Sequence, residues 1–254
     1  MAWVYRIALM LIVLVGSGCT VPIISERELE LESDGEFKKM RNQMTESRDA
    51  RTIAYVQCVS DAILAEVDEP YAGLDWEVVV FEDEAVNAFA LPGGHIGVFT
   101  GLLKVAENQD QLAAVIGHEV AHVTERHSYE QVNRQLTTQG AVYAGAAVIG
   151  GGQTTYDLLS MGAQIGVTLP FGRGAESEAD VVGLDFMAEA GFDPRGSVQL
   201  WKNMDAEGGA GPPAFLSTHP SSSTRISSLI AQLPEALDKF NAARAEGKRP
   251  DCRL

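Results

Sequence analysis

One short motif near the middle of the chain constrains the fold more than any other feature. His118, Glu119 and His122 form an H-E-x-x-H motif within the apolar run from Ala114 to Val123. Residues four apart on a helix lie one above the other, about 6 Å apart along its axis, so both imidazoles can reach one ion. Glu119 lies one step round, where its carboxylate can take a proton from a water at that ion. Because ionisable side chains are costly to bury unpaired, the motif predicts a buried helix that carries a metal site.

A zinc site that leaves one position open for water needs three protein ligands. The best candidate for the third is Glu176, which opens the acidic run ESEAD on a second predicted helix. Asp180 falls on the same helical face and can orient a ligating histidine through its other ring nitrogen. Glu178 lies at the wrong angle and is the weaker candidate. His127 follows His122 by five residues, about 140° round a continuous helix, which predicts a surface or second-layer position.

Composition and charge exclude several classes of protein. The chain has 254 residues, 46% of them hydrophobic, which is enough to bury a core in one or two domains. Its formal net charge is −16, with 19 basic and 35 acidic residues. Phosphate binding needs a clustered basic surface, so we expect no nucleic-acid partner.

The first residues are typical of a bacterial lipoprotein signal peptide, expected over residues 1–18. Arg6 is the only charged side chain in this stretch, and the apolar run over residues 7–15 is too short to span a bilayer comfortably. Small residues then lead to Cys19, although Gly16 stands where lipoprotein signals usually have leucine. Acyl chains on Cys19 would anchor the protein, and Thr20 favours the outer membrane, facing the periplasm. A plain secretory signal with an incidental cysteine is the alternative.

The remaining chain is expected to hold a charged linker over residues 19–49 and one domain over residues 50–254. Its pattern predicts an α+β fold that is mostly helical, with extended segments at residues 74–81 and 87–100 forming a small sheet. Helices are expected at residues 36–67, 110–127, 139–150, 156–167 and 175–190, with a last helical pattern from about residue 222. Cys58 and Cys252 either form a disulfide in an oxidising compartment or remain two free thiols.

Three further motifs accompany the histidine pair in a fixed order. They are NAFALPGG from Asn87, the acidic run from Glu176, and the dipeptide His219-Pro220 followed by Arg225. Together with GHEVAH they resemble the HtpX-like and CAAX-prenyl-protease family of zinc metallopeptidases over residues 50–233. Membrane-embedded members of this family carry long hydrophobic helices, which this sequence lacks after residue 15, so the resemblance points to its lipid-anchored bacterial branch.

The resemblance implies a gluzincin fold with one zinc ion per chain. His118, His122 and Glu176 would be the ligands, with Glu119 as general base and Asp180 behind the ligands. His219 would sit over the metal, where it either stabilises the oxyanion or occupies the fourth coordination position.

The same resemblance places substrate along a strand of four residues, Asn87, Ala88, Phe89 and Ala90. Backbone pairing of this kind is weakly selective, which suits degradation of unfolded or misassembled envelope proteins. The alternative is a chaperone-like or outer-membrane assembly factor with little constitutive proteolysis, which acts with an assembly or regulatory protein.

Three basic side chains near the motifs complete the candidates. Arg173 and Arg225 flank motif elements and are candidates to pair with the acidic cluster or the substrate. His95 is expected to be structural rather than catalytic.

Overall fold

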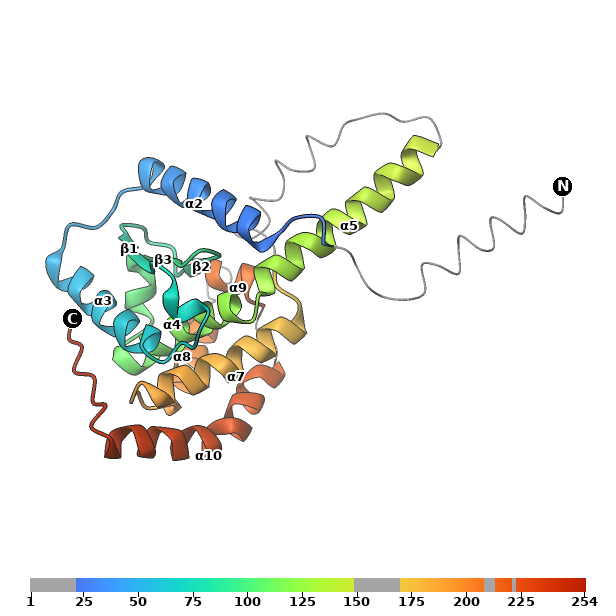
Figure 1. The fold of residues 1–254 in the computed structure, drawn as a ribbon. Coiled ribbons are helices and arrows are strands. Elements are labelled where there is room, and N and C mark those ends of the chain that lie inside the picture. The colour runs from blue at the N-terminus through green and yellow to red at the C-terminus, as the bar shows by residue number, and fades with distance from the viewer. Residues whose placement is uncertain (1–21, 149–169, 208–212, 221–222) are drawn as a thin grey trace.

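The computed structural model describes residues 22–148, 170–207, 213–220 and 223–254 as a helical body around one small sheet (Figure 1). The expected signal peptide, Cys19 and the helix expected over residues 156–167 lie outside the described residues. None of the described helices combines the length and the apolar sequence needed to cross a membrane.

All three strands come from one short part of the chain, and helices precede and follow them. In order they are α2 (Glu26–Gln43), α3 (Ala50–Leu64), η2 (Tyr71–Gly73), β1 (Glu77–Phe81), β2 (Ala88–Leu91), β3 (His95–Phe99), η3 (Thr100–Lys104), α4 (Gln109–Thr124), α5 (His127–Val148), α7 (Arg173–Glu189), α8 (Arg195–Ala206), α9 (Ala214–Thr218) and α10 (Ser223–Ala245).

The sheet is mixed, as the sequence predicts, with strand order β1-β3-β2. β1 pairs with β3 in parallel, and β2 pairs with β3 in antiparallel through a turn at Gly93 and Gly94. Both glycines have φ near +90°, a conformation that side chains with a Cβ rarely adopt. Alternate residues of β2 face opposite sides: Ala88 and Ala90 join the core with α4, whereas Phe89 joins the cluster under α2.

Helix α4 is the centre of the fold, and it carries the histidine motif. Asn108 caps its N-terminus by accepting hydrogen bonds from the backbone amides of Asp110 and Gln111. Residues 111–123 of this helix are all buried, because α3, α7, α8 and β2 pack around it. The apolar run in the sequence is therefore a helix buried on all sides rather than an amphipathic one.

Two glycines allow α4 and α7 to cross with their backbones in contact. A Cβ on Gly183 would lie 2.6 Å from the backbone nitrogen of His118, and one on Gly117 would lie 2.7 Å from the Gly183 oxygen. Both distances are too short for real carbon atoms, so the crossing requires glycine on each side. This contact brings the acidic first turn of α7 to the histidines of α4.

The segment expected as a charged linker forms a helix in the structure. Ser25 and Glu28 make a reciprocal capping box at the start of α2. Leu29 and Phe37 are buried on one face of α2, where the Phe37 ring lies 6.3 Å from that of Phe89. The sequence analysis expected helix only from residue 36 and missed the first part of α2, because only a few large apolar residues, spaced about two turns apart, form its buried face.

The single helix expected over residues 36–67 is also divided. The chain between α2 and α3 runs beside β1, where the Ser47 amide donates to the Val80 carbonyl and the Glu82 amide donates to the Thr45 carbonyl. Asp49 then caps α3. The strand pairing, which depends on residues distant in the sequence, interrupts the helical pattern.

A disulfide joins Cys58 of α3 to Cys252 near the C-terminus, across 194 residues of sequence. Of the two alternatives that the sequence left open, the structure has the bonded one. The bond holds the C-terminal segment against the body of the domain, where Cys252 is buried.

We predict that replacing Gly183 with alanine separates the two crossing helices and destabilises the protein. The expected loss is about 1–3 kcal/mol in the free energy of unfolding, measured by urea denaturation. Gly174 is the matched control, because it lies in the same helix and a Cβ there meets no atom of the described residues within 4 Å. Gly174→Ala should change stability by less than about 0.5 kcal/mol. Equal midpoints for the two variants would contradict the proposed role of the crossing.

Candidate metal centre

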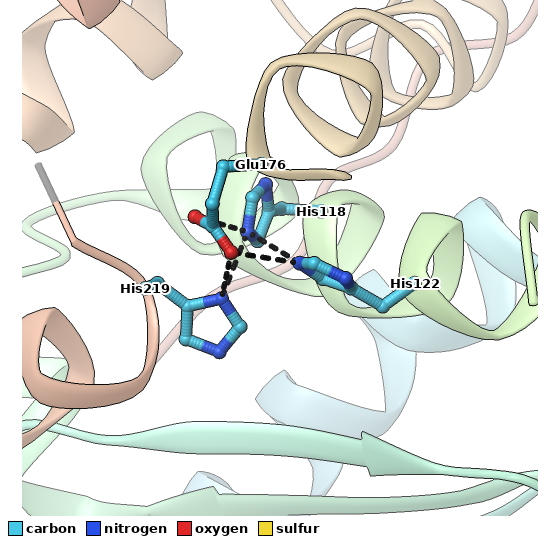
Figure 2. A group of neighbouring side chains, drawn as sticks. All are labelled: His118, His122, Glu176 and His219. Carbon is cyan, nitrogen blue, oxygen red and sulfur yellow. Dashed lines mark hydrogen bonds and ion pairs between the residues drawn. The ribbon is translucent and has the colours of Figure 1, made fainter. Parts of the chain in front are cut away.

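Four buried side chains from three helical elements converge on one point (Figure 2). His118 and His122 come from α4, Glu176 from the first turn of α7, and His219 from the residue that ends α9. Each side chain offers one ligand atom, and these atoms all lie within 4.8 Å of one another. All four residues are 5% exposed or less.

The spacing of the donor atoms suits a tetrahedral zinc ion. His118 Nε2 lies 3.1 Å from His122 Nε2 and 3.2 Å from His219 Nδ1. Glu176 Oε1 lies 3.1 Å from His219 Nδ1 and 3.4 Å from His122 Nε2. Ligands bound at about 2.0–2.1 Å to a tetrahedral ion lie about 3.3–3.4 Å from one another. One zinc ion therefore fits this set of nitrogen and oxygen donors.

The hydrogen bonds behind the two α4 histidines support the same conclusion. His118 Nδ1 lies 3.2 Å from Asp180 Oδ1, and His122 Nδ1 lies 3.0 Å from His127 Nδ1. If both Nδ1 atoms carry protons for these partners, both Nε2 atoms present lone pairs to each other. Two lone pairs at 3.1 Å repel each other, and a metal ion bound between them would relieve that repulsion.

The electrostatics of the cluster also suit a metal. Burial lowers the pKa of His118, and it lowers that of His122 to about 4, so both rings are neutral at pH 7, as metal ligands must be. Burial alone would raise the pKa of Glu176. Hydrogen bonds with His122 and His219 outweigh burial and lower this pKa well below its usual range, which keeps the carboxylate ionised.

Glu119 lies beside the cluster, and its two carboxylate oxygens have different partners. Its Oε2 accepts a hydrogen bond from the Ala90 backbone amide at 3.1 Å. Its Oε1 is buried in an ion-pair contact 3.3 Å from His219 Nε2 and accepts no hydrogen bond from the described residues. Burial raises the pKa of Glu119 to about 7. A carboxyl group in this position can exchange a proton near neutral pH.

Of the two arginines that the sequence analysis named, only Arg225 reaches the cluster. Its Nη1 donates to Glu176 Oε2 at 2.8 Å, and its Nη2 donates to Asp180 Oδ1 at 2.6 Å. Asp180 thereby lies behind His118 and is held by a buried cation. Arg173 is exposed at the start of α7 and makes no hydrogen bond or ion pair with the cluster among the described residues.

Aromatic rings enclose the site, and sequence reasoning missed all of them. The Phe171 ring stacks on His122 with centroids 4.0 Å apart, and the Phe215 ring stacks on His219 at 4.4 Å. The Arg225 guanidinium lies 3.5 Å from the centre of the Trp201 ring. These residues come from separate elements, and the only local signal is that Phe171 and Phe215 each stand within five residues of a motif.

The remaining predicted residues fall into three places. Glu178 is not in the cluster, and its exposed carboxylate reaches His127 instead. His95 lies away from the cluster, buried under α2 and stacked on Phe37 at 4.8 Å. Asn87 immediately precedes β2. The other three residues of the predicted substrate strand, Ala88, Phe89 and Ala90, lie in β2, which forms one edge of the sheet among the described strands. Within that edge, the Ala90 amide points away from β3 and toward Glu119.

Comparisons with known proteins agree with the geometry. The model of peptidase family M48 matches residues 50–232. The mitochondrial metalloendopeptidase OMA1 of Schizosaccharomyces pombe is 43% identical over 188 residues, covering 73% of this chain and 54% of that protein. OMA1 of Bos taurus is 32% identical over 243 residues, covering 89% and 46%. A putative beta-barrel assembly-enhancing protease of Vibrio cholerae is 27% identical over 219 residues, covering 83% and 44%. The chain spans about half the length of these curated relatives.

We predict that replacing Arg225 with glutamine strongly destabilises the metal-free protein. The substitution would leave the carboxylates of Glu176 and Asp180 buried without their cation, at a cost of about 3–5 kcal/mol in the free energy of unfolding. Arg173→Gln is the matched control on the exposed side of α7 and should cost less than about 0.5 kcal/mol. Urea denaturation measures both. A similar loss in the two variants would show that Arg225 does not balance the buried carboxylates.

Proposed function

The chain belongs to peptidase family M48 and carries that family's zinc metalloendopeptidase domain, and on this premise we propose that it degrades unfolded or misassembled proteins of the bacterial cell envelope. The observation that supports this proposal best is the position of Glu119. One of its carboxylate oxygens accepts a hydrogen bond from the Ala90 amide of the edge strand, and the other faces His219 of the donor cluster. A candidate base, a candidate metal site and a strand edge thus lie together, which is the set of groups that metal-dependent hydrolysis of an extended peptide uses.

In the proposed mechanism, His118, His122 and Glu176 would hold a zinc ion. Zinc bound there would supply a Lewis acid that polarises the scissile carbonyl and lowers the pKa of water. Glu119 accepts a proton from the attacking water and passes it to the leaving amine. His219, whose Nε2 lies near Glu119, donates a hydrogen bond to the oxyanion once its ring leaves the cluster.

We propose that substrate pairs with the outer edge of β2 in an extended conformation. Ala88 and Ala90 direct backbone groups away from β3, whereas the Phe89 side chain packs on the far face toward α2. Contacts of this kind use the substrate backbone and tolerate many side chains. A peptide would have to compete with Glu119 for the Ala90 amide, which couples substrate binding to release of the base.

The closed geometry of the cluster favours a second candidate function. His219 occupies a place among the donor atoms, and no cluster member is more than 5% exposed. A site closed in this way suits a chaperone-like or outer-membrane assembly factor that cleaves little until a regulatory or assembly partner opens it. A relative that is named a putative beta-barrel assembly-enhancing protease supports an envelope assembly partner.

We also propose that the chain belongs to the lipid-anchored bacterial branch of the HtpX-like and CAAX-prenyl-protease family. Acyl chains on Cys19 would anchor it in the outer membrane, with the domain facing the periplasm. The basis is the signal-peptide pattern of residues 1–18. Mass spectrometry of the mature N-terminus should show acyl chains on Cys19. A mature chain that is cleaved elsewhere, or that carries an unmodified Cys19, would remove the anchor.

The peptidase proposal predicts zinc-dependent cleavage of an unfolded protein such as casein by the purified chain. A chelator should abolish cleavage, and added zinc should restore it. Glu119→Gln should keep zinc but lower the rate at least about 100-fold, because the amide cannot accept the proton. Glu125→Gln, at the end of the same helix, is the control and should cleave at the wild-type rate.

Wild-type cleavage by Glu119→Gln would contradict the assignment of the base. His219→Ala separates the two candidate functions in the same assay. Faster cleavage by this variant would show that His219 closes the site. Zinc binding without cleavage by either protein, together with rescue of a deletion strain by Glu119→Gln, would favour the assembly factor.

A further inference from the structure

A chain of hydrogen-bonding groups runs from the metal site to the protein surface through His127. His122 Nδ1 lies 3.0 Å from His127 Nδ1, and His127 Nε2 lies 3.3 Å from Glu178 Oε2. The two histidines are 1% and 5% exposed, whereas the Glu178 side chain is 59% exposed. Neither His127 nor Glu178 belongs to the donor cluster.

The geometry assigns every proton in this chain. The Nε2 atom of His122 faces the cluster, so it must be unprotonated to bind a metal, and the proton of the neutral ring then lies on Nδ1. This N–H donates to His127 Nδ1, which accepts. The remaining proton of His127 is on Nε2 and points to the Glu178 carboxylate, which can only accept. Each group has one available role, and the roles are compatible.

The backbone between α4 and α5 makes this contact possible. In one continuous helix, His127 would lie about 140° round from His122 and could not reach it. Instead α4 ends at Thr124, Arg126 has φ of +60°, and α5 begins at His127. This left-handed conformation is unusual for a residue other than glycine, and such positions concentrate at functional sites. The Arg126 side chain is held by an ion pair with Glu26.

We propose that His127 is a positioning residue for the metal site: its Nδ1 accepts a hydrogen bond from the Nδ1–H of His122 and so fixes the orientation of that ring. Glu178 in turn fixes the orientation of His127 by accepting a hydrogen bond from its Nε2–H. The two α4 ligands then have different supports. Asp180 and Arg225 hold His118 from behind, and the pair of His127 and Glu178 holds His122. This inference rests on the proposed metal site. It gives His122 a hydrogen-bonded partner that is separate from the partners of His118.

Two substitutions of His127 separate positioning from packing. Asn places its Oδ1 where His has Nδ1, so His127→Asn keeps the acceptor for His122 but loses most of the ring. His127→Phe keeps the ring beside Phe171 but has no acceptor. If His127 positions His122, the Asn variant should bind zinc within about threefold of wild type, and the Phe variant should bind about 10- to 100-fold more weakly. If His127 only fills space, this order reverses.

The measurement is the zinc dissociation constant of the purified chain, determined by competition with a chromophoric chelator. Urea denaturation of each metal-free variant tests whether it is folded. Glu178→Ala should weaken zinc binding about threefold, because water can replace an exposed carboxylate as acceptor. Glu130→Ala, an exposed acid three residues after His127 in α5, should leave zinc affinity unchanged.

The outcomes distinguish failure of the metal site from failure of the positioning role of His127. Wild-type protein that binds no zinc would overturn the metal site itself. Wild-type protein that binds zinc, with His127→Phe binding as well as or better than His127→Asn, would overturn the positioning role and leave the metal site in place. Weaker binding by His127→Phe alone, with both variants folded, would establish it.

Discussion

The structure depends on one electrostatic constraint, which is that four metal-ligand atoms are buried around a single point. Metal binding needs the Nε2 atoms of His118 and His122 unprotonated, and their lone pairs then face each other at 3.1 Å beside the buried carboxylate of Glu176. A cation at the centre would turn these unfavourable contacts into bonds. In the metal-free protein, Arg225 balances part of the buried negative charge.

Much of the surrounding fold maintains this arrangement. The glycine crossing of α4 and α7 sets the distance between the histidine helix and the glutamate helix, and Arg225 compensates the carboxylates that the crossing buries. The edge strand lies beside the same helix and binds Glu119 through the Ala90 amide. The donor cluster, Glu119 and the strand edge are therefore parts of one packing arrangement rather than separate features.

The local part of this arrangement could be read from the sequence, and the rest could not. Helical spacing relates His118 to His122 and Glu176 to Asp180, because those pairs depend only on residues four apart. The sequence allowed a second-layer position for His127, but its contact with His122 depends on the left-handed residue Arg126, which no spacing indicates. Phe171 gave no such signal, since its contact depends on packing between distant elements. Helix α2 was expected as linker because its apolar residues are sparse, and its buried face becomes evident only against the sheet.

The central claim is that nitrogen and oxygen donors of this chain hold one zinc ion. Zinc X-ray absorption spectroscopy of the purified chain, with the metal content measured on the same sample, tests it most directly. The account predicts one zinc per chain, with imidazole and carboxylate ligands at about 2.0–2.1 Å. Protein without stoichiometric zinc, or a zinc–sulfur distance of about 2.3 Å, would contradict it.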